Sequence, residues 1–384
     1  MIKMFTAFTE EIDDVDAAVS ELLAQLDMDH KGLKNSLGIV HCYSDFLDSG
    51  VIKALYEKLS FDIVGTTTFS LSAQGIMSQT GLILTVLTSD TVSFTTGVSA
   101  PVVDTVDDPV TELYKNLTAG LPQKPAMFLP FVPFMKNVGG DEFIEKIDSL
   151  SGGVPSFGTL AISNEPDLSR SYTIRNGGYY PGSLVLAALT GDVDPVFLSA
   201  SVTDDNILKQ KAVVTGSNRN ILQSVNNMPA VKYLETLGLA KNGDIAGLES
   251  MPFIVYLEDG SRLIRACIGA TEDGGVILCG AVPVNSTLAL ATMGLEDVVN
   301  STGDLAVEAL KKAAGRGILM YSCAARYWAQ GVQITAEEEK IEEKIGDAAP
   351  YHFVYSGGEI FPEFLSSGKV VNHLQNDSLI ICIL

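Results

Sequence analysis

Two polar side chains follow a buried strand late in the sequence, where ligand sites are common. The apolar residues 317–322 are typical of a strand, and Cys323 and Arg326 come directly after it. Loops at the carboxyl ends of strands often build the ligand sites of α/β sheets. We therefore predict that Arg326 clamps a carboxylate and that Cys323 lines the pocket. The alternative is that Cys323 is a small core residue and that Arg326 is solvated or paired locally.

Other polar residues end or begin strands at comparable places. Glu359 follows Gly357 and Gly358, and a parallel neighbouring strand would bring it near Arg326 to hold the two charges of a zwitterion. Threonine hydroxyls at the end of an earlier strand could bind an anion or an amide, although β-branched residues also simply fill strands. The predicted ligand-binding set is Arg326, Glu359, Asn376, Ser378, Thr66, Thr67, Thr68 and Gly358.

The sequence offers little else for catalysis. His41 and Cys42 are adjacent on a predicted strand, so their side chains point to opposite faces and cannot readily form a dyad. The four histidines show no metal-ligand spacing, and no phosphate-binding glycine motif follows a strand. We expect neither a metal nor a cofactor. Cys323 is the one candidate nucleophile, and it needs a lowered thiol pKa to act as one.

Three stretches of the chain repeat the order strand, helix, strand, strand. Apolar residues alternate with a period of two in the strands and of 3.6 in the helices. The units comprise residues 38–43, 51–59, 61–68 and 82–88, then 127–131, 141–150, 154–162 and 184–189, then 317–322, 336–345, 351–359 and 379–383. The acidic helix at residues 336–345 is expected to face solvent.

A region of different character separates the second and third units. Short strands joined by Asn, Gly and Asp turns, with one helix at residues 226–238, predict an antiparallel β-rich insert between residues 196 and 290. We therefore predict a mixed α/β fold of three β-α-β-β units plus this insert, with mixed sheets covered by helices. The predicted domains are residues 1–195 and 196–384.

Several segments resemble the FIST family, sensory proteins with an N-terminal and a C-terminal FIST domain. The most specific are Cys323 with Arg326, residues 355–360 ending in Gly-Gly-Glu-Ile, and the Asn-Asp-Ser strand start at residues 376–378. Residues 64–68 resemble the family's Gly-Cys-Thr-Thr segment, with Thr66 in place of Cys. The resemblance implies a sensor for a small ligand such as an amino acid, acting as a stand-alone module through a signalling protein partner.

Composition narrows the classes of partner. The 384 residues carry a net charge of −22, which opposes binding to nucleic acid or to anionic membranes. Five scattered cysteines, the absence of a secretory signal pattern and the absence of a long apolar run predict a cytoplasmic protein. Two other classes stay open: an enzyme, a hydrolase or transferase using Cys323, and an interaction protein that docks through its acidic surface.

Overall fold

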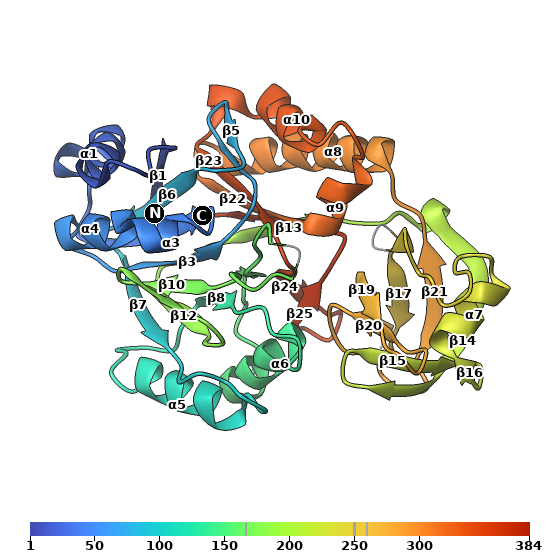
Figure 1. Cartoon of the computed structure of the whole chain (residues 1–384). Coiled ribbons are helices and arrows are strands. Elements are labelled where there is room, and N and C mark those ends of the chain that lie inside the picture. The colour runs from blue at the N-terminus through green and yellow to red at the C-terminus, as the bar shows by residue number, and fades with distance from the viewer. Residues whose placement is uncertain (166, 249–250, 259) are drawn as a thin grey trace.

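The computed structural model describes residues 1–165, 167–248, 251–258 and 260–384. Helices cover three mixed sheets, which confirms the predicted α/β class. A body holds three six-stranded sheets, and the β-rich insert forms a lobe beside it (Figure 1). None of the helices in the described residues combines the length and the apolar character that a bilayer crossing needs.

The three sheets of the body share one strand order. In each sheet the two middle strands are parallel and all other neighbours are antiparallel. The first sheet runs β1 (Lys3–Thr9), β6 (Leu82–Ser89), β2 (Asn35–Cys42), β3 (Ile63–Thr67), β10 (Thr173–Arg175), β11 (Gly178–Tyr180). The second runs β7 (Val92–Val98), β12 (Val185–Gly191), β8 (Met127–Val132), β9 (Gly158–Leu160), β24 (Glu359–Phe364), β25 (Val370–Gln375). The third runs β13 (Val196–Ala200), β26 (Leu379–Ile383), β22 (Ile318–Cys323), β23 (Tyr351–Ser356), β4 (Leu71–Ala73), β5 (Ile76–Ser78).

The outer hairpin of every sheet comes from a different part of the chain. The hairpin β10–β11 joins the first sheet, β24–β25 joins the second, and the N-terminal hairpin β4–β5 joins the third. Two of these hairpins cross the boundary predicted between residues 195 and 196. The two-domain division stays a prediction, and the sheets on its two sides are interlocked.

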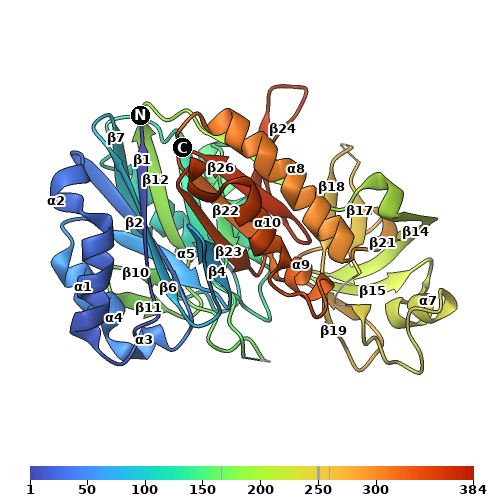
Figure 2. The same ribbon diagram turned by 90° about the horizontal axis from the view of Figure 1, so that it is seen from above.

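Amphipathic helices cover the outer faces of the sheets, as Figure 2 shows from above. α1 illustrates how the sequence specifies them: Asp14 caps its first turn by accepting from the Ala17 amide, and Ala18, Val19, Leu22 and Leu26 are buried at helical spacing. The longer helices are α1 (Val15–Leu26), α4 (Val51–Lys58), α5 (Asp107–Thr118), α6 (Gly140–Ser151), α8 (Leu295–Ala313) and α10 (Ala336–Lys344). The short ones are α2 (Met28–Lys31), α3 (Phe46–Ser49), α7 (Ala230–Thr236) and α9 (Ala324–Ala329).

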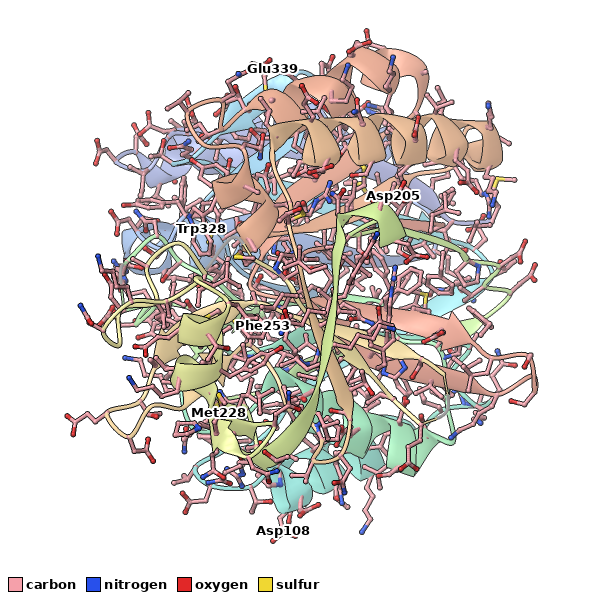
Figure 3. All side chains as sticks on the ribbon, turned by 90° about the vertical axis from the view of Figure 1, so that its right-hand side faces the viewer. Asp108, Asp205, Met228, Phe253, Trp328 and Glu339 are labelled. Atoms are coloured by element: carbon pink, nitrogen blue, oxygen red, sulfur yellow. The ribbon has the colours of Figure 1, made fainter. Side chains whose placement is uncertain are left out.

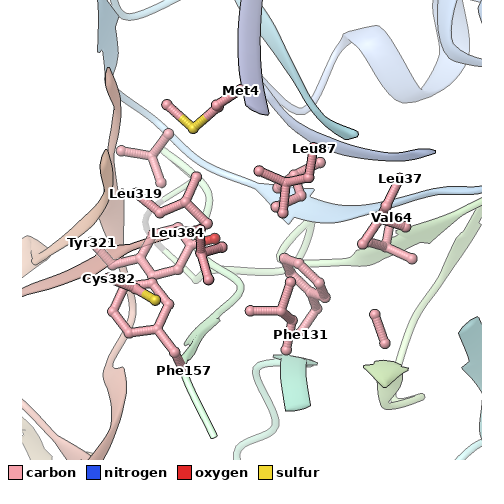
Figure 4. Packing of buried hydrophobic residues seen from close by; sticks show 14 of the residues in the cluster. Met4, Leu37, Val64, Leu87, Phe131, Phe157, Leu319, Tyr321, Cys382 and Leu384 are labelled. Carbon is pink, nitrogen blue, oxygen red and sulfur yellow. The ribbon is translucent and has the colours of Figure 1, made fainter. Parts of the chain in front are cut away.

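The inner faces of the three sheets meet in one apolar core. Leu37 and Val64 from the first sheet, Phe131 from the second, and Leu319 and Tyr321 from the third all contribute to it (Figure 4). Along β2 the residues alternate, because Leu37 and Ile39 enter this core while Val40 and Cys42 pack under the helices. The body is therefore held together at its centre by contributions from every sheet.

The insert leaves the third unit between β13 and α8 and is antiparallel, as predicted. Figure 3 looks onto it, with Glu339 of α10 above and Asp108 of α5 below in the body behind. Its strands follow the order β18 (Arg262–Arg265), β17 (Phe253–Tyr256), β21 (Thr287–Ala291), β14 (Ile207–Asn218), β15 (Ile221–Val225), β20 (Val276–Leu278), β19 (Cys267–Ala270), with β16 (Met228–Pro229) beside β15. One of the turns predicted to join the insert strands, at residues 258–261, includes position 259, which lies outside the described residues.

Candidate functional site

A polar cavity of about 240 Å³ lies where the body meets the insert. Its walls come from β13 and β26 of the third sheet, from the exchanged hairpin β24–β25, and from the insert strand β18. Ile264, Phe361 and Ile380 supply apolar surface. The polar lining residues are Ser199, Ser201, Arg262, Glu363, His373, Gln375 and Ser378. The lining thus carries hydroxyls and two charged side chains, Arg262 and Glu363, which pair with Asp204 and His373 respectively.

Gln375 fastens the insert to the body at the edge of this cavity. Its side-chain oxygen accepts from the Ile264 amide at 2.9 Å, and its amide nitrogen donates to the Arg262 carbonyl at 3.2 Å. The Arg262 guanidinium donates to Asp204 at 2.7 Å and to the Val202 carbonyl at 3.2 Å. The Gln375 bonds fix the β18 backbone, and the Asp204 carboxylate already pairs with the Arg262 guanidinium at the cavity wall.

Ser378 connects the cavity to a buried carboxyl group. Its hydroxyl donates to Oε2 of Glu359 at 2.7 Å, and the Glu359 side chain is fully buried. Oε1 of Glu359 has no hydrogen-bond partner among the described residues. Burial raises the pKa of Glu359 well above its usual value, and the nearby Asp377 carboxyl raises it further, while the Ser378 hydrogen bond opposes them.

Asp377 is a second buried carboxyl group beside the first. It begins the loop turn into β26 with a φ of 54°, a left-handed conformation that Asp tolerates. Neither carboxyl oxygen has a hydrogen-bond partner among the described residues, and the side chain is fully buried. Burial raises the pKa of Asp377 to about 7. The carboxyl groups of Glu359 and Asp377 therefore both have oxygens without hydrogen-bond partners among the described residues, and Ser378 links Glu359 to the cavity lining.

Other predicted residues gather around this pair. Asn376 accepts from the Ala266 amide at 3.3 Å and donates to the Gly357 carbonyl at 3.5 Å, so it joins insert and body. A Cβ on Gly358 would lie 3.1 Å from the Asn376 amide nitrogen, so a larger residue there would crowd this contact. Cys323 is buried, and burial followed by the Glu359 charge raises its thiol pKa well above the usual value. A thiol held protonated is a poor nucleophile.

Arg326 lies in a different buried network. Its guanidinium forms an ion pair with Glu337, Nη2 to Oε1 being 2.7 Å, and donates to the Thr302 hydroxyl at 2.8 Å. Glu337 also accepts from Ser322 at 2.9 Å and from Tyr355 at 3.1 Å. Glu337, and not the expected Glu359, is thus the carboxylate partner. Glu337 and Glu338 are both buried, so the prediction that this helix face is solvated is wrong for its first turn.

The three threonines also bond within the protein. Thr66 pairs with the His41 ring at 2.9 Å, and Thr67 accepts from the Tyr172 amide at 3.0 Å. Thr68 donates to the Tyr355 carbonyl at 2.7 Å, which ties the first unit to the third. The structure therefore brings together Glu359, Asn376, Ser378, Gly358 and Cys323, and places Arg326 and the threonines elsewhere. Of the predicted residues, Ser378 alone lies on the cavity lining.

Sequence reasoning missed most of the cavity lining. Arg262 lies in a predicted strand of the insert, whereas Glu363, His373 and Gln375 lie on the hairpin β24–β25, most of which was not predicted as strand from the sequence. Asp377 stands inside the motif quoted above, between two predicted residues. The charged residue at the start of the predicted insert strand is a signal that could have singled out Arg262.

The fold and the site define an α/β protein with a polar cavity between a triple-sheet body and an inserted lobe. The FIST N domain matches residues 36–228 and the FIST C domain matches residues 229–362, so the chain belongs to the FIST family, whose domains are recognised as sensory domains.

No curated protein matches the chain. Among solved structures, a cyanuric acid hydrolase from A. caulinodans is similar over 100% of this chain and 98% of its own, with a TM-score of 0.34 and 7% identity. Similarity at that level says nothing about the activity of this chain.

Proposed function

We propose that this protein is a sensory module that binds a small polar metabolite, such as an amino acid, in the cavity between the body and the insert, and signals through a protein partner. The observation that carries the proposal is that one cavity, with a volume of about 240 Å³, is lined by both Arg262 and Glu363. Drug-sized ligands occupy pockets of roughly 300–1,000 Å³, so this one suits a smaller molecule.

The position of the cavity supports a signalling role. A ligand there touches the insert through Arg262 and Ile264 and the body through Ser199, Phe361 and Ser378. A ligand that contacts both parts favours whichever arrangement lets it make both sets of contacts. Binding would therefore bias how the insert sits on hairpin β24–β25, and a partner protein could recognise that arrangement.

The test is binding to the purified protein. Thermal shift against amino acids, small carboxylates, nucleotides and polyamines should yield a dose-dependent rise in the unfolding temperature, because a ligand that binds only the native state stabilises it. Arg262→Gln should reduce the shift. Arg219→Gln is the matched control, since Arg219 also pairs with a carboxylate and donates to backbone carbonyls, yet lies outside the cavity lining. Equal shifts in both variants would remove this cavity from the proposal.

Hydrogen exchange tests the signalling step separately. Ligand should slow exchange of the Ile264 and Asn376 amides, which hold β18 against β25 through Gln375 and the Ile264 carbonyl. Unchanged exchange at both amides with ligand bound would argue that binding in the cavity does not alter the contact between the insert and the body. The alternative enzyme that uses Cys323 is less well supported, because burial holds that thiol protonated.

A further inference from the structure

A groove of about 290 Å³ lies between α8 and α10, the helices that cover the outer face of the third sheet. The two helices lie side by side (Figure 1) and pack closely, because a Cβ on Gly303 of α8 would lie 3.3 Å from Cδ of Lys340 of α10. Leu295 and Val299 of α8 and Ala336 of α10 line this α8–α10 groove and are only partly buried. The groove can therefore take up apolar side chains of another molecule.

Carboxylates border the apolar part of the groove. Glu296 of α8 and Glu339 and Glu343 of α10 are on its lining, and all three are exposed. Lys340 is the only cation on that lining, and it pairs with Glu343. Glu296 and Glu339 form no ion pair within the part of the chain that the structure describes. The groove thus carries a net negative charge around an apolar floor.

An exposed tryptophan lies in the segment that leads into the groove. Trp328 of α9 is 47% exposed, and its ring is parallel to that of Phe69, with 6.4 Å between the centroids. Val332 is 98% exposed and directly precedes Gln333, which lines the groove. Tryptophan is enriched among the residues that dominate binding energy at protein interfaces. Because Phe69 supports the ring from behind, a partner that covers Trp328 has little side-chain motion to freeze.

We propose that the α8–α10 groove, with Trp328 at its edge, docks a helix of the signalling partner that has leucine-type side chains on one face and Lys or Arg beside them. The apolar face fills the groove, as in other helix-in-groove complexes, and the basic side chains meet Glu296 and Glu339. Charge complementarity selects this partner over a second copy of the chain, whose own groove would bring carboxylates against carboxylates. This inference rests on the proposed function, because it names the surface through which the sensor signals.

The chain connects this groove to the ligand cavity. β18 lines the cavity and pairs with β17, and β17 pairs with β21, the last strand of the insert. Residues 292–294 then lead into α8, whose first turn supplies Leu295 and Glu296 to the groove. A ligand that biases how the insert sits on the body therefore acts on the end of a helix that the partner contacts.

The first experiment titrates the full chain with an amphipathic helix of Leu and Lys, about four turns long. Trp328 is the only tryptophan of the chain, so a shift of its emission to shorter wavelength reports docking at this surface. The control peptides are the same helix with Glu in place of Lys and a Leu-Lys peptide of equal composition without an apolar face. At about 0.15 M salt each control should bind at least about tenfold more weakly. Equal binding of all three peptides, or no binding of the Leu-Lys helix, would overturn the docking surface.

Charge reversal then locates the binding site. Glu296→Lys combined with Glu339→Lys should weaken the Leu-Lys helix at least about tenfold. Asp108→Lys combined with Glu112→Lys changes the net charge equally on exposed residues of α5, at the opposite end of the molecule in Figure 3, and should alter affinity by no more than about twofold. Equal losses in the two double variants would overturn the docking surface.

Trp328→Ala is the second variant, which keeps the test valid if the charge-reversed groove does not fold. Anisotropy of a labelled peptide should show weaker binding, while Phe364→Ala, which removes another exposed ring, should bind like the parent. Unchanged binding to Trp328→Ala would overturn its place in the surface. The groove lies outside the cavity lining, so both groove variants should keep the thermal shift with the small ligand. A ligand shift without helix binding overturns the docking surface alone, and helix binding at the groove without any ligand shift overturns the proposed ligand cavity alone.

Discussion

The guanidinium of Arg326 and the carboxylate of Glu337 form a buried ion pair, with 2.7 Å between Nη2 and Oε1 and side-chain exposures of 1% and 0%. Arg326 lies on α9, directly after β22, and Glu337 lies in the first turn of α10. Thr302 of α8 donates to the same carboxylate oxygen at 2.8 Å. One ion pair therefore locks three helices onto the end of the third sheet.

Arg326→Ala should destabilise the fold by about 3–5 kcal/mol, because it leaves the Glu337 carboxylate buried without its cation. Urea unfolding measures the loss. Lys312→Ala, which breaks the exposed pair with Glu308, is the control and should cost no more than about 1 kcal/mol. Intact stability with weakened ligand binding would instead restore the ligand role that the sequence predicted for Arg326.

Glu338 should make the protein less stable as the pH rises toward 8. Burial raises its pKa from 4.5 to about 8, while the hydrogen bond from Ser70 opposes this. Between these two values the native state keeps a proton that the unfolded state gives up. The stabilisation of the fold by this proton is therefore fully present below pH 4.5 and is lost as the pH rises through 8. Each pKa unit corresponds to about 1.4 kcal/mol.

Urea midpoints from pH 5 to pH 8 test this slope. Glu338→Gln should flatten it, because the amide does not titrate. Glu339→Gln, on the exposed neighbouring residue, should leave the slope as it is. A pH profile of Glu338→Gln that matches the parent protein would show that this carboxyl does not titrate in the expected window.

Asp377→Asn should stabilise the protein at pH 8 by about 1–3 kcal/mol, by removing a buried carboxylate that lacks donors. Its pKa is raised by burial from 3.8 to about 7, so the folded protein holds the proton between these values and loses this stabilisation as the pH rises through 7. The gain should vanish at about pH 3, below the unfolded-state pKa of 3.8, where the carboxyl is largely protonated in both states.

Asn is a fair replacement, because it also tolerates a φ of 54°. Destabilisation at pH 8 would mean that Asp377 has a donor in solution that satisfies it.

Cys323 should resist alkylation by iodoacetamide in the native protein at pH 8, because burial and the Glu359 charge hold its thiol protonated. Peptide mass mapping measures modification at each cysteine. All five should react once the chain is unfolded in urea, which serves as the internal control. Rapid labelling of Cys323 alone in the native protein would support the alternative function, an enzyme that uses the Cys323 thiolate as its nucleophile.

Much of the architecture follows from local sequence patterns. The alternation of apolar residues in β2 and the helical stripe of α1 each place one face inward, and the turn residues of the insert specify antiparallel neighbours. The mixed α/β class, the β-rich insert and the positions of most strands were predictable for this reason. The added hairpins were not assigned, because a short hairpin carries no mark of the sheet it joins.

The sequence by itself determined the elements, the family and the acidic, globular character of the chain. The tertiary structure decided that Arg326 pairs with Glu337, that Thr68 bonds to the Tyr355 carbonyl, and that Ser378 connects Glu359 to a cavity which Arg262 lines from the insert. Local periodicity depends on neighbours within one or two turns. A cavity depends on which segments, more than a hundred residues apart in the chain, come to lie within a few ångströms, and no local pattern encodes that choice.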